Sequence, residues 1–291
     1  MLSGTITALV TPMRDEKVDL DALKRLVRRQ LDAGVDGLVP CGTTGEAATL
    51  SRTEYDSVIE TVVTEVAGAV PVIAGTGTNS TNRVIETTKR TAALGATAAL
   101  VVTPYYNKPT QEGLYQHYKK VADESGLPIV LYNVPGRTGC NLLPQTVARL
   151  ADLPGIIAVK EASGSLDQLY DVVTGCGDKL DVLTGDDALA FPSICAGARG
   201  VVSVTSNVVP DRMSQMVQAT LDGNMIKARE FHYQLLDLFR AMFFETNPIP
   251  VKTAMGLMGL MDPEIRLPLW MMSPQAKGRL EQVLRFNRLI P

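Results

Sequence analysis

A lysine ends a short apolar run near the middle of the chain. The run covers residues 156–162 (IIAVKEA), and a Ser-Gly-Ser turn follows it at 163–165. If the run is a strand, its side chains point alternately to opposite faces of a sheet. The alternation predicts that Lys160 lies over apolar neighbours, while the carboxylate of the next residue points away. The two faces would carry Ile156, Ala158 and Lys160, and Ile157, Val159 and Glu161.

An amine in such surroundings could act as a nucleophile. Loss of water disfavours the cation, and a neutral lysine amine attacks ketones to form Schiff bases. Taken alone, Lys160 is more simply interpreted as a solvated or salt-bridged lysine at a strand end, because most such lysines do no chemistry. The rest of the chain has to decide between these two interpretations.

Two kinds of segment alternate along the first two thirds of the chain. Short β-like runs lie at residues 4–10, 37–40, 71–74, 98–103, 128–133, 156–160, 181–184 and 200–204. Amphipathic, helix-like segments lie between them at residues 19–33, 52–66, 81–94, 112–124, 144–150, 166–173 and 188–196. Ser51 with Glu54 forms a capping-box pattern, and Pro144 suits a first helical turn.

This alternation predicts the fold class. Apolar strands that alternate with helices indicate a parallel sheet covered on both faces. Eight such units in about 200 residues predict a closed (β/α)₈ TIM barrel rather than an open sheet. An open, doubly wound sheet would usually show a glycine-rich loop after its first strand, where Thr-Pro-Met stands at 11–13. The chain also has no Gly-Lys-Ser/Thr phosphate loop.

The alternation stops after residue 204. Helix-like segments follow at residues 210–221, 224–244, 251–260 and 274–286, without strands between them. We therefore predict a catalytic barrel domain over residues 1–206 and a C-terminal helical extension over residues 207–291 that packs on the barrel. The apolar residues of this extension recur at helical spacing, which is typical of a core or a subunit interface rather than a cofactor site.

The composition restricts the classes of function. With 291 residues, 45% of them hydrophobic, the chain should form a packed globular protein. A net charge of −3 and the lack of a basic run disfavour nucleic-acid binding. The four scattered cysteines and two distant histidines predict neither a disulfide framework nor a metal site. We see no signal-peptide pattern and no stretch long enough to span a bilayer, so we expect a soluble protein of a reducing compartment.

Polar residues gather where the predicted strands end, which in a barrel is the active-site face. Each has a simpler interpretation: Tyr132 as a packed aromatic residue, Arg137 as a solvated loop charge, and a threonine pair as a turn and helix cap. Their convergence on one rim favours imine chemistry on a ketone that carries a carboxylate. The set contains Thr43, Thr44, Glu46, Tyr105, Tyr106, Tyr132, Arg137, Lys160, Asp186, Asp187, Ser203 and Thr205.

Five motifs resemble those of the dihydrodipicolinate synthase (4-hydroxy-tetrahydrodipicolinate synthase) family, a group of class I pyruvate-dependent aldolases and lyases. They are GTTGE at 42–46, PYYNKP at 104–109, YNVPGRTG at 132–139, KEA at 160–162 and NPIPVK at 247–252. The likeness runs over essentially the whole chain in the family's order. The first motif and the lysine mark only the wider class, whereas Arg-Thr-Gly after Tyr-Asn-Val-Pro points to the synthase.

The resemblance implies a reaction and the residues that carry it. Lys160 would form an imine with pyruvate, and Tyr132, Thr44 and Tyr106 would relay protons, with Tyr106 reaching in from a neighbouring subunit. The imine would condense with L-aspartate 4-semialdehyde to give 4-hydroxy-tetrahydrodipicolinate, in diaminopimelate and lysine biosynthesis. The family is usually a cytoplasmic homotetramer, a dimer of dimers, and its chemistry requires no metal or organic cofactor.

The resemblance also implies how the substrates are held. Thr43 and Thr44 would bind the carboxylate of pyruvate, and Arg137 the carboxylate of aspartate 4-semialdehyde. A guanidinium suits that second carboxylate because its planar fork binds with two parallel hydrogen bonds. Gly185 and the backbone at Val202 would line the pocket.

One departure concerns regulation. Family members that are inhibited by lysine commonly have a histidine and a glutamate where this chain has Tyr55 and Arg83. Asn79 and Tyr105 of the possible effector site are retained. A guanidinium would repel the ammonium group of lysine, so we expect feedback by lysine to be weak or absent.

Two alternatives remain open at this stage. The chain could be another Schiff-base aldolase, acting on N-acetylneuraminate or a 2-keto-3-deoxy sugar acid, although such an enzyme should not need Arg137 in its Arg-Thr-Gly context. It could also be a barrel that binds a keto acid without catalysis. Trapping an adduct on Lys160 with borohydride and pyruvate separates an enzyme from a binding protein.

Overall fold

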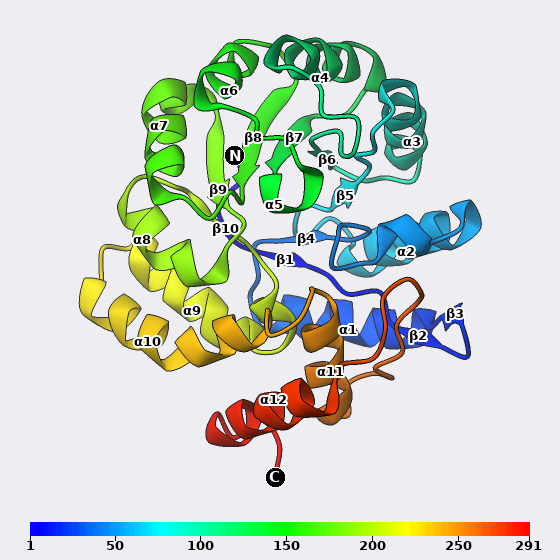
Figure 1. The fold of residues 1–291 in the computed structure, drawn as a ribbon, viewed down its shortest axis with the longest axis vertical. Coiled ribbons are helices and arrows are strands. Elements are labelled where there is room, and N and C mark those ends of the chain that lie inside the picture. The colour runs from blue at the N-terminus through cyan, green and yellow to red at the C-terminus, as the bar shows by residue number, and fades with distance from the viewer.

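The computed structural model describes residues 1–291 and contains one eight-stranded parallel sheet (Figure 1). Its strands run in the order β4-β1-β10-β9-β8-β7-β6-β5. A parallel bridge between Leu38 and Val72 joins the two end strands, so the sheet closes on itself. The predicted (β/α)₈ barrel is confirmed. Its strands are β1 (Gly4–Ala8), β4 (Gly37–Val39), β5 (Ile73–Gly75), β6 (Ala98–Val102), β7 (Ile129–Asn133), β8 (Ile156–Glu161), β9 (Asp181–Thr184) and β10 (Gly200–Ser203).

Helices cover the outside of the barrel (Figure 1). The predicted helical segments are all present, and α2 begins with the expected capping box, in which Ser51 and Glu54 exchange hydrogen bonds. Such a box satisfies two backbone N–H groups that the first turn leaves free. The helices are α1 (Leu20–Asp32), α2 (Arg52–Val66), α3 (Thr81–Ala93), α4 (Gln111–Ser125), α6 (Pro144–Ala151), α7 (Leu166–Cys176) and α8 (Ala190–Cys195).

Two apolar layers hold the barrel together. The interior layer contains one or two side chains from each strand, among them Ile6, Val130, Ala158 and Val202. The alternate side chains of the same strands, such as Val159, pack outward against the helices. This arrangement follows from the two-residue period of a strand, and it aims each strand's last inward residue at the mouth of the barrel.

The start of β8 departs from the predicted alternation. A register shift against β7 pairs Ile129 with Ile156 but Val130 with Ala158, so one residue of β8 is extra. Because of this bulge, Ile156 packs in the outer layer and Ile157 against the interior, the reverse of the prediction. From Ala158 onward the predicted faces are correct. Lys160 therefore reaches the interior face with Ala158, as expected.

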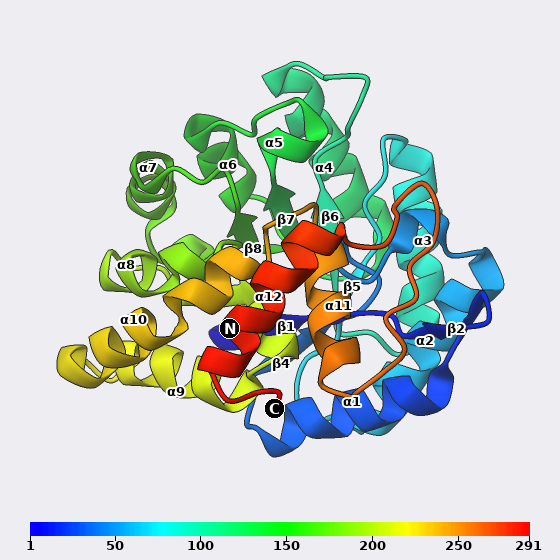
Figure 2. The ribbon, with the colours of Figure 1, turned by 60° about the horizontal axis from the view of Figure 1, so that its bottom comes forward.

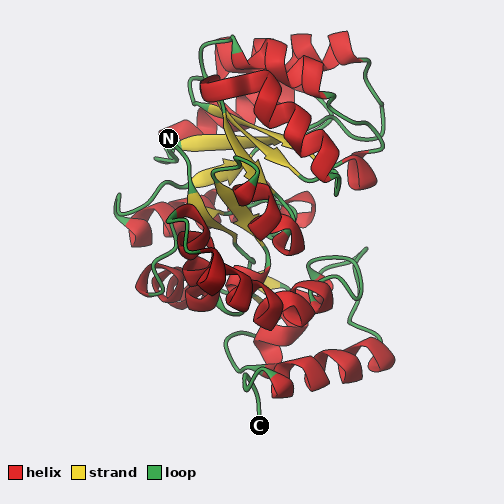
Figure 3. Ribbon diagram, turned by 90° about the vertical axis from the view of Figure 1, so that its left-hand side faces the viewer, coloured by secondary structure: helices red, strands yellow, loops and turns green.

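The polypeptide continues after β10 into helices α9 (Pro210–Leu221), α10 (Met225–Ala241), α11 (Ile249–Leu257) and α12 (Pro274–Phe286). Figure 2 brings α10, α11 and α12 forward, and Figure 3 shows the C-terminal helices beside the sheet rather than within it. We propose that residues 207–291 form an extension packed on the barrel. One core cluster supports this, because it joins extension residues such as Phe239 and Met255 to barrel residues such as Val201 and Leu26.

A short hairpin and a short helix were not predicted from the sequence. Strands β2 (Met13–Arg14) and β3 (Lys17–Val18) form a hairpin whose turn residues, Asp15 and Glu16, have φ values of 53° and 60°. Asn-Gly or Gly-Gly usually marks such a turn, so this one carries no recognisable sequence pattern. Helix α5 (Pro135–Thr138) has only four residues, and it was not predicted either. None of the helices in the structure combines the length and the apolar character that crossing a bilayer requires.

Candidate active site at the barrel mouth

Lys160 and Tyr132 are neighbours across two strands. They are register partners on β8 and β7, and the Lys160 Nζ lies 4.3 Å from the centre of the Tyr132 ring. Each residue is only 6% exposed. Lys160 forms no ion pair with any carboxylate. The amine is therefore buried against an aromatic face instead of being neutralised by a counter-ion.

The carboxylate next to Lys160 points the other way, as the strand alternation predicted. Glu161 accepts hydrogen bonds from the Ser163 backbone N–H at 2.7 Å, from Asn133 Nδ2 at 3.0 Å and from Gln168 Nε2 at 3.1 Å. These donors lie outside the barrel interior, and they hold the carboxylate there. Lys160 and Glu161 are adjacent in sequence, but the amine lies on one face of β8 and the carboxylate on the other.

The space around the Lys160 side chain requires a glycine at position 185. A Cβ placed on Gly185 would lie 2.7 Å from Lys160 Cε and 2.7 Å from Ala162 Cβ. Real Cβ atoms do not come that close to other carbons, so any larger residue would displace the lysine. Val202, which the resemblance also assigned to the pocket, is buried in the interior layer.

The turn after β4 presents two threonines. Thr44 is buried, and its Oγ1 accepts a hydrogen bond of 3.0 Å from Asn247 Nδ2. Thr43 is half-buried and lines the mouth. Thr11 fixes the turn by donating its hydroxyl to the backbone carbonyl of Gly45 at 2.7 Å.

Arg137 lies on α5, directly after the strand that carries Tyr132. Its side chain is exposed, and one guanidinium nitrogen donates to the backbone carbonyl of Asn247 at 3.2 Å. No carboxylate of the chain pairs with it. The guanidinium keeps donors free, which suits an anionic ligand.

A cavity of about 500 Å³ opens between the barrel rim and the C-terminal extension. Its wall includes Thr43, Tyr132 and Arg137 from the barrel and Asn247 from the extension. Lys160 and Thr44 stand just behind this wall, because Lys160 contacts Tyr132 and Thr44 contacts Asn247. The structure thus places five of the predicted residues around one cavity large enough for two small acids.

Tyr106 stands apart from this group. It is 88% exposed and has a φ of 73°, a left-handed conformation that non-glycine residues rarely adopt. Tyr105 is 39% exposed and lines the cavity. Asn107 links the two retained positions of the possible effector site, because its backbone N–H donates to the Tyr105 carbonyl at 2.9 Å and its side chain donates to the Asn79 carbonyl at 3.0 Å. Within one chain, Tyr106 does not reach the residues that it was predicted to serve.

No individual role was predicted for Asn247 and Lys252, which contact rim residues from the extension. Asn247 touches both Thr44 and Arg137, and Lys252 Nζ forms a buried ion pair of 2.5 Å with Glu46 Oε1. Asn247 and Lys252 lie in the NPIPVK motif, but neither their spacing nor their residue types indicate a partner 200 positions away. The only available indication was the motif itself.

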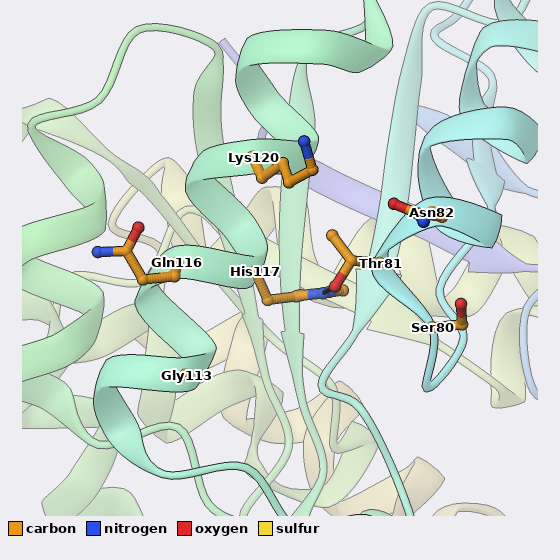
Figure 4. Close-up of a pocket in the computed structure, with 7 residues that line it drawn as sticks. All are labelled: Ser80, Thr81, Asn82, Gly113, Gln116, His117 and Lys120. Atoms are coloured by element: carbon orange, nitrogen blue, oxygen red, sulfur yellow. Dashed lines mark hydrogen bonds between the residues drawn. The ribbon is translucent and has the colours of Figure 1, made fainter.

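A second cavity of about 470 Å³ lies on the outside of the barrel (Figure 4). It is formed by the start of α3 and one face of α4, and in Figure 4 the His117 ring lies beside Thr81. His117 Nδ1 is 2.9 Å from Thr81 Oγ1, and burial lowers the pKa of His117 to about 4. No carboxylate lines this cavity, and no group of three or more His, Cys, Asp or Glu residues in the chain could hold a metal ion. The barrel mouth therefore remains the candidate site.

The model of the Dihydrodipicolinate synthetase family matches residues 1–286. The chain is 54% identical to the 4-hydroxy-tetrahydrodipicolinate synthase of Geotalea daltonii over 290 residues, which cover all of both chains.

Solved structures of dihydrodipicolinate synthases superimpose on the whole chain. A dihydrodipicolinate synthase from Thermotoga maritima superimposes with a TM-score of 0.98 at 46% identity, with all of both chains covered. A chloride-inhibited dihydrodipicolinate synthase from Acinetobacter baumannii, crystallised with pyruvate, superimposes with a TM-score of 0.98 at 43% identity, again over all of both chains.

Proposed function

This chain belongs to the dihydrodipicolinate synthetase family, and we propose that it condenses pyruvate with L-aspartate 4-semialdehyde through a Schiff base on Lys160. The product is 4-hydroxy-tetrahydrodipicolinate, an intermediate of diaminopimelate and lysine biosynthesis. The observation that carries the assignment of Lys160 is its burial at the barrel mouth over the Tyr132 ring, without a carboxylate partner. Such an amine has no ionic partner that would block its reaction, and a neutral amine is the nucleophile that imine formation needs.

The reaction divides into steps that balance. The Lys160 amine attacks the ketone carbon of pyruvate, and water leaves as the imine forms. The imine nitrogen draws electrons from the neighbouring methyl group, which loses a proton to give an enamine. The enamine carbon attacks the aldehyde of the second substrate, and the new alkoxide takes up a proton. The amine of that substrate then adds to the imine carbon, closes the ring and releases Lys160.

We propose that hydroxyl groups at the barrel mouth carry the proton steps. We assign the relay to Tyr132 and Thr44, because both are buried and each is within one contact of the cavity. A positioned hydroxyl relay lets a proton leave the methyl group and reach the alkoxide without bulk water. Thr43 and Thr44 would also receive the carboxylate of pyruvate in their turn.

Arg137 would bind the carboxylate of aspartate 4-semialdehyde. Its guanidinium is exposed at the cavity wall and lacks a carboxylate partner within the chain, which supports this assignment. Gly185 and Val202 would shape the pocket around the imine, since Gly185 leaves room for the Lys160 side chain. A sugar-acid aldolase of the same class would have no second carboxylate for Arg137 to bind.

Tyr106 would complete the relay of a second subunit in a homotetramer. Its exposure of 88% in the single chain supports this proposal, because the ring is free to contact a neighbouring subunit. The covalent imine supplies the electron sink, so we propose that no metal or organic cofactor takes part. We further propose that the enzyme acts in the cytoplasm, together with the other steps of amino-acid biosynthesis.

Feedback by lysine should be weak or absent. Arg83 is exposed on α3, where its cation would repel the ammonium of the effector. Tyr55 is buried, with its hydroxyl donating to the Gly75 carbonyl at 3.0 Å, so it offers no free group in place of a histidine. Half-inhibition of the purified enzyme by sub-millimolar lysine would contradict this proposal.

Borohydride reduction in the presence of pyruvate tests the assignment directly. The reduced imine should leave a permanent mass increase on the peptide that contains Lys160 and none on the peptide that contains the other buried lysine, Lys252. No adduct would favour a keto-acid binding protein instead. Turnover of aspartate 4-semialdehyde, but not of N-acetylneuraminate or 2-keto-3-deoxy sugar acids, would separate the synthase from the related aldolases.

A further inference from the structure

A hydrogen-bonded pair of side chains lies on the outer face of the sheet, one residue after Lys160 and Tyr132. Glu161 and Asn133 are register partners on β8 and β7, directly after the register pair Lys160 and Tyr132. Asn133 is 0% exposed and Glu161 is 2% exposed. Asn133 Nδ2 donates to Glu161 Oε2 at 3.0 Å. The same two strands therefore carry the lysine and the tyrosine on their inner face and a polar contact on their outer face.

Two further amides complete this group, which we call the outer amide cluster and which consists of Asn133, Asn141, Glu161 and Gln168. Asn141 Oδ1 accepts from Asn133 Nδ2 at 2.8 Å and from Gln168 Nε2 at 3.1 Å, and Asn141 Nδ2 donates to Gln168 Oε1 at 2.7 Å. Gln168 Nε2 also donates to Glu161 Oε2 at 3.1 Å. Asn133 Oδ1 accepts from the Leu142 backbone N–H at 2.9 Å. Each of the three amide nitrogens thus donates within the cluster.

Glu161 is the member of the cluster that only accepts. Its Oε1 accepts from the Ser163 backbone N–H at 2.7 Å, and its Oε2 accepts from Asn133 and Gln168. An ionised carboxylate accepts through both oxygens, whereas a lysine ammonium carries only donors. Position 161 therefore requires an acid, and a lysine turned to this face would leave three donors without an acceptor.

This requirement bears on the register of β8. Backbone hydrogen bonds form in any register, and a slip of one residue turns every side chain to the opposite face. The apolar residues of β8 do not select one register, since the bulge places Ile156 in the outer layer and Ile157 against the interior. The two residues of β8 that are not apolar are Lys160 and Glu161. A slip would bring the ammonium to the amide donors and the carboxylate into the apolar interior, and both changes cost free energy.

We propose that Glu161 and Asn133 are positioning residues that fix the register of β8 against β7, and so hold Lys160 on the interior face over the Tyr132 ring. Neither Glu161 nor Asn133 lines the cavity, so they act through the strand and not on the substrate. The inference rests on the proposed function, because its measurable consequence is the rate at which Lys160 attacks pyruvate.

Glu161→Gln tests the proposal and nearly keeps the shape of the side chain. Whichever way the new amide is turned, its nitrogen faces a donor, either the Ser163 N–H or the amide nitrogens of Asn133 and Gln168. We expect the rate of borohydride trapping at a fixed pyruvate concentration to fall between about tenfold and 100-fold, as for a nucleophile displaced by about 1 Å. The rate is measured per folded molecule, well below the thermal unfolding temperature of each variant. Trapping at the wild-type rate would overturn the proposal.

A second substitution should restore the rate. In Asn133→Asp combined with Glu161→Gln, the carboxylate moves to position 133. One of its oxygens accepts from the Leu142 N–H, as Asn133 Oδ1 does, and the other accepts from the amide at position 161. The amides of Asn141 and Gln168 can rotate to match. We expect this double variant to trap pyruvate within about threefold of the wild-type rate, because the two substitutions are coupled through one contact. A double variant as slow as Glu161→Gln would overturn the proposal.

Tyr118→Phe is the matched control for a general loss of stability. Tyr118 is fully buried in the same outer layer, and its hydroxyl donates to the Val101 carbonyl at 3.1 Å, away from the outer amide cluster. The variant should lower the thermal unfolding temperature and leave the trapping rate unchanged. A trapping rate that fell with stability in this control would mean that Glu161 has no specific role, and would overturn the proposal.

Gln168→Met covers the case in which Glu161→Gln does not fold. Gln168 is half-buried at the edge of the cluster, and the change removes one of the three donors to Glu161. We expect the trapping rate to fall about threefold, since two donors still hold the carboxylate. An unchanged rate would count against the proposal.

Trapping in the wild-type protein separates this inference from the function on which it rests. If the wild-type protein forms no adduct on Lys160, the proposed function falls and this inference with it. If the wild-type protein forms the adduct and Glu161→Gln traps pyruvate equally fast, only the role of the outer amide cluster falls.

Discussion

The molecule buries two lysines next to residues that line the cavity, and their surroundings differ in one respect. Lys160 ends an interior strand, lies over the Tyr132 ring and has no carboxylate partner. Lys252 lies on α11, is completely buried and pairs with Glu46. One has no ionic partner, and the other is bound in an ion pair.

Burial alone therefore does not make a lysine reactive. Burial lowers the pKa of Lys252, and the Glu46 carboxylate at 2.5 Å acts in the opposite direction, whereas no carboxylate pairs with Lys160. The difference lies in where the neighbouring acids point. Glu161, next to Lys160, is on the other face of β8, whereas Glu46 is directed at Lys252. Strand alternation turns the acid next to Lys160 away from it. A contact between residues far apart in the sequence brings an acid to Lys252.

The largest effect should come from removing the reactive amine. Lys160→Met should abolish the borohydride-trapped adduct and lower kcat on the order of 10⁴-fold or more, because no other group can form the imine. The thermal unfolding temperature should change little, since Lys160 has no ion pair to lose. A variant that kept its activity would show that the comparison between the two lysines assigns chemistry to the wrong one.

The paired lysine should show the opposite result. Lys252→Met leaves Glu46 buried without its partner, which should lower the free energy of unfolding by about 3–5 kcal/mol, while the adduct on Lys160 still forms. Adding Glu46→Gln should recover most of that stability, because the uncompensated charge is removed. Urea unfolding of both variants measures this. Equal stability of Lys252→Met and the wild-type protein would mean that the pair is not buried as described.

The face of β8 on which Lys160 lies could be predicted from the sequence, because it depends only on neighbouring residues of the same strand. A strand has a period of two residues, so the parity of positions 158, 160 and 161 predicted which face each would take. The same reasoning was wrong at Ile156 and Ile157, where a bulge adds a residue to β8. Nothing in an apolar run distinguishes a bulged strand from a regular one, because either residue is acceptable to either layer.

The contacts of Lys252 and Asn247 could not be predicted, because they depend on residues far away in the sequence. Their partners, Glu46 and Thr44, are more than 200 residues away, and the contact exists only once the extension packs across the barrel mouth. Helical periodicity predicted that the extension would pack, but not which polar residues it would bring to the rim. Tyr106 is 88% exposed in the single chain, and its part in the site of a neighbouring subunit stays a prediction.

His117 provides a third buried base with which to sharpen the comparison. Its neighbour is the neutral hydroxyl of Thr81, and burial lowers its pKa to about 4. Unfolded histidine binds a proton near pH 6.5, so the unfolded state takes up more protons than the folded state between pH 6.5 and 4, and stability falls as the pH decreases through that range. The loss should reach about 3 kcal/mol near pH 4.

His117→Gln isolates this contribution from the carboxylates that also titrate in acid. Unfolding by urea at pH 7 and at pH 4 should show a smaller loss of stability for the variant than for the wild-type protein. Identical losses would mean that His117 is protonated in the folded state. It would then resemble Lys252, a buried cation, and not Lys160.

The smallest effect that we expect concerns the room around Lys160. In Gly185→Ala the new methyl group would lie 2.7 Å from Lys160 Cε, so the lysine side chain must move away from the position in which it reaches pyruvate. A misplaced nucleophile attacks more slowly. We therefore expect kcat/KM for pyruvate to fall about tenfold, while the adduct still forms slowly. The rate of borohydride trapping at a fixed pyruvate concentration measures this directly. Gly136→Ala is the matched control, because a Cβ there meets no atom within 4 Å and should leave the trapping rate unchanged. If Gly185→Ala traps pyruvate at the wild-type rate, the reactivity of Lys160 depends only on its lack of a carboxylate partner and not on its exact position.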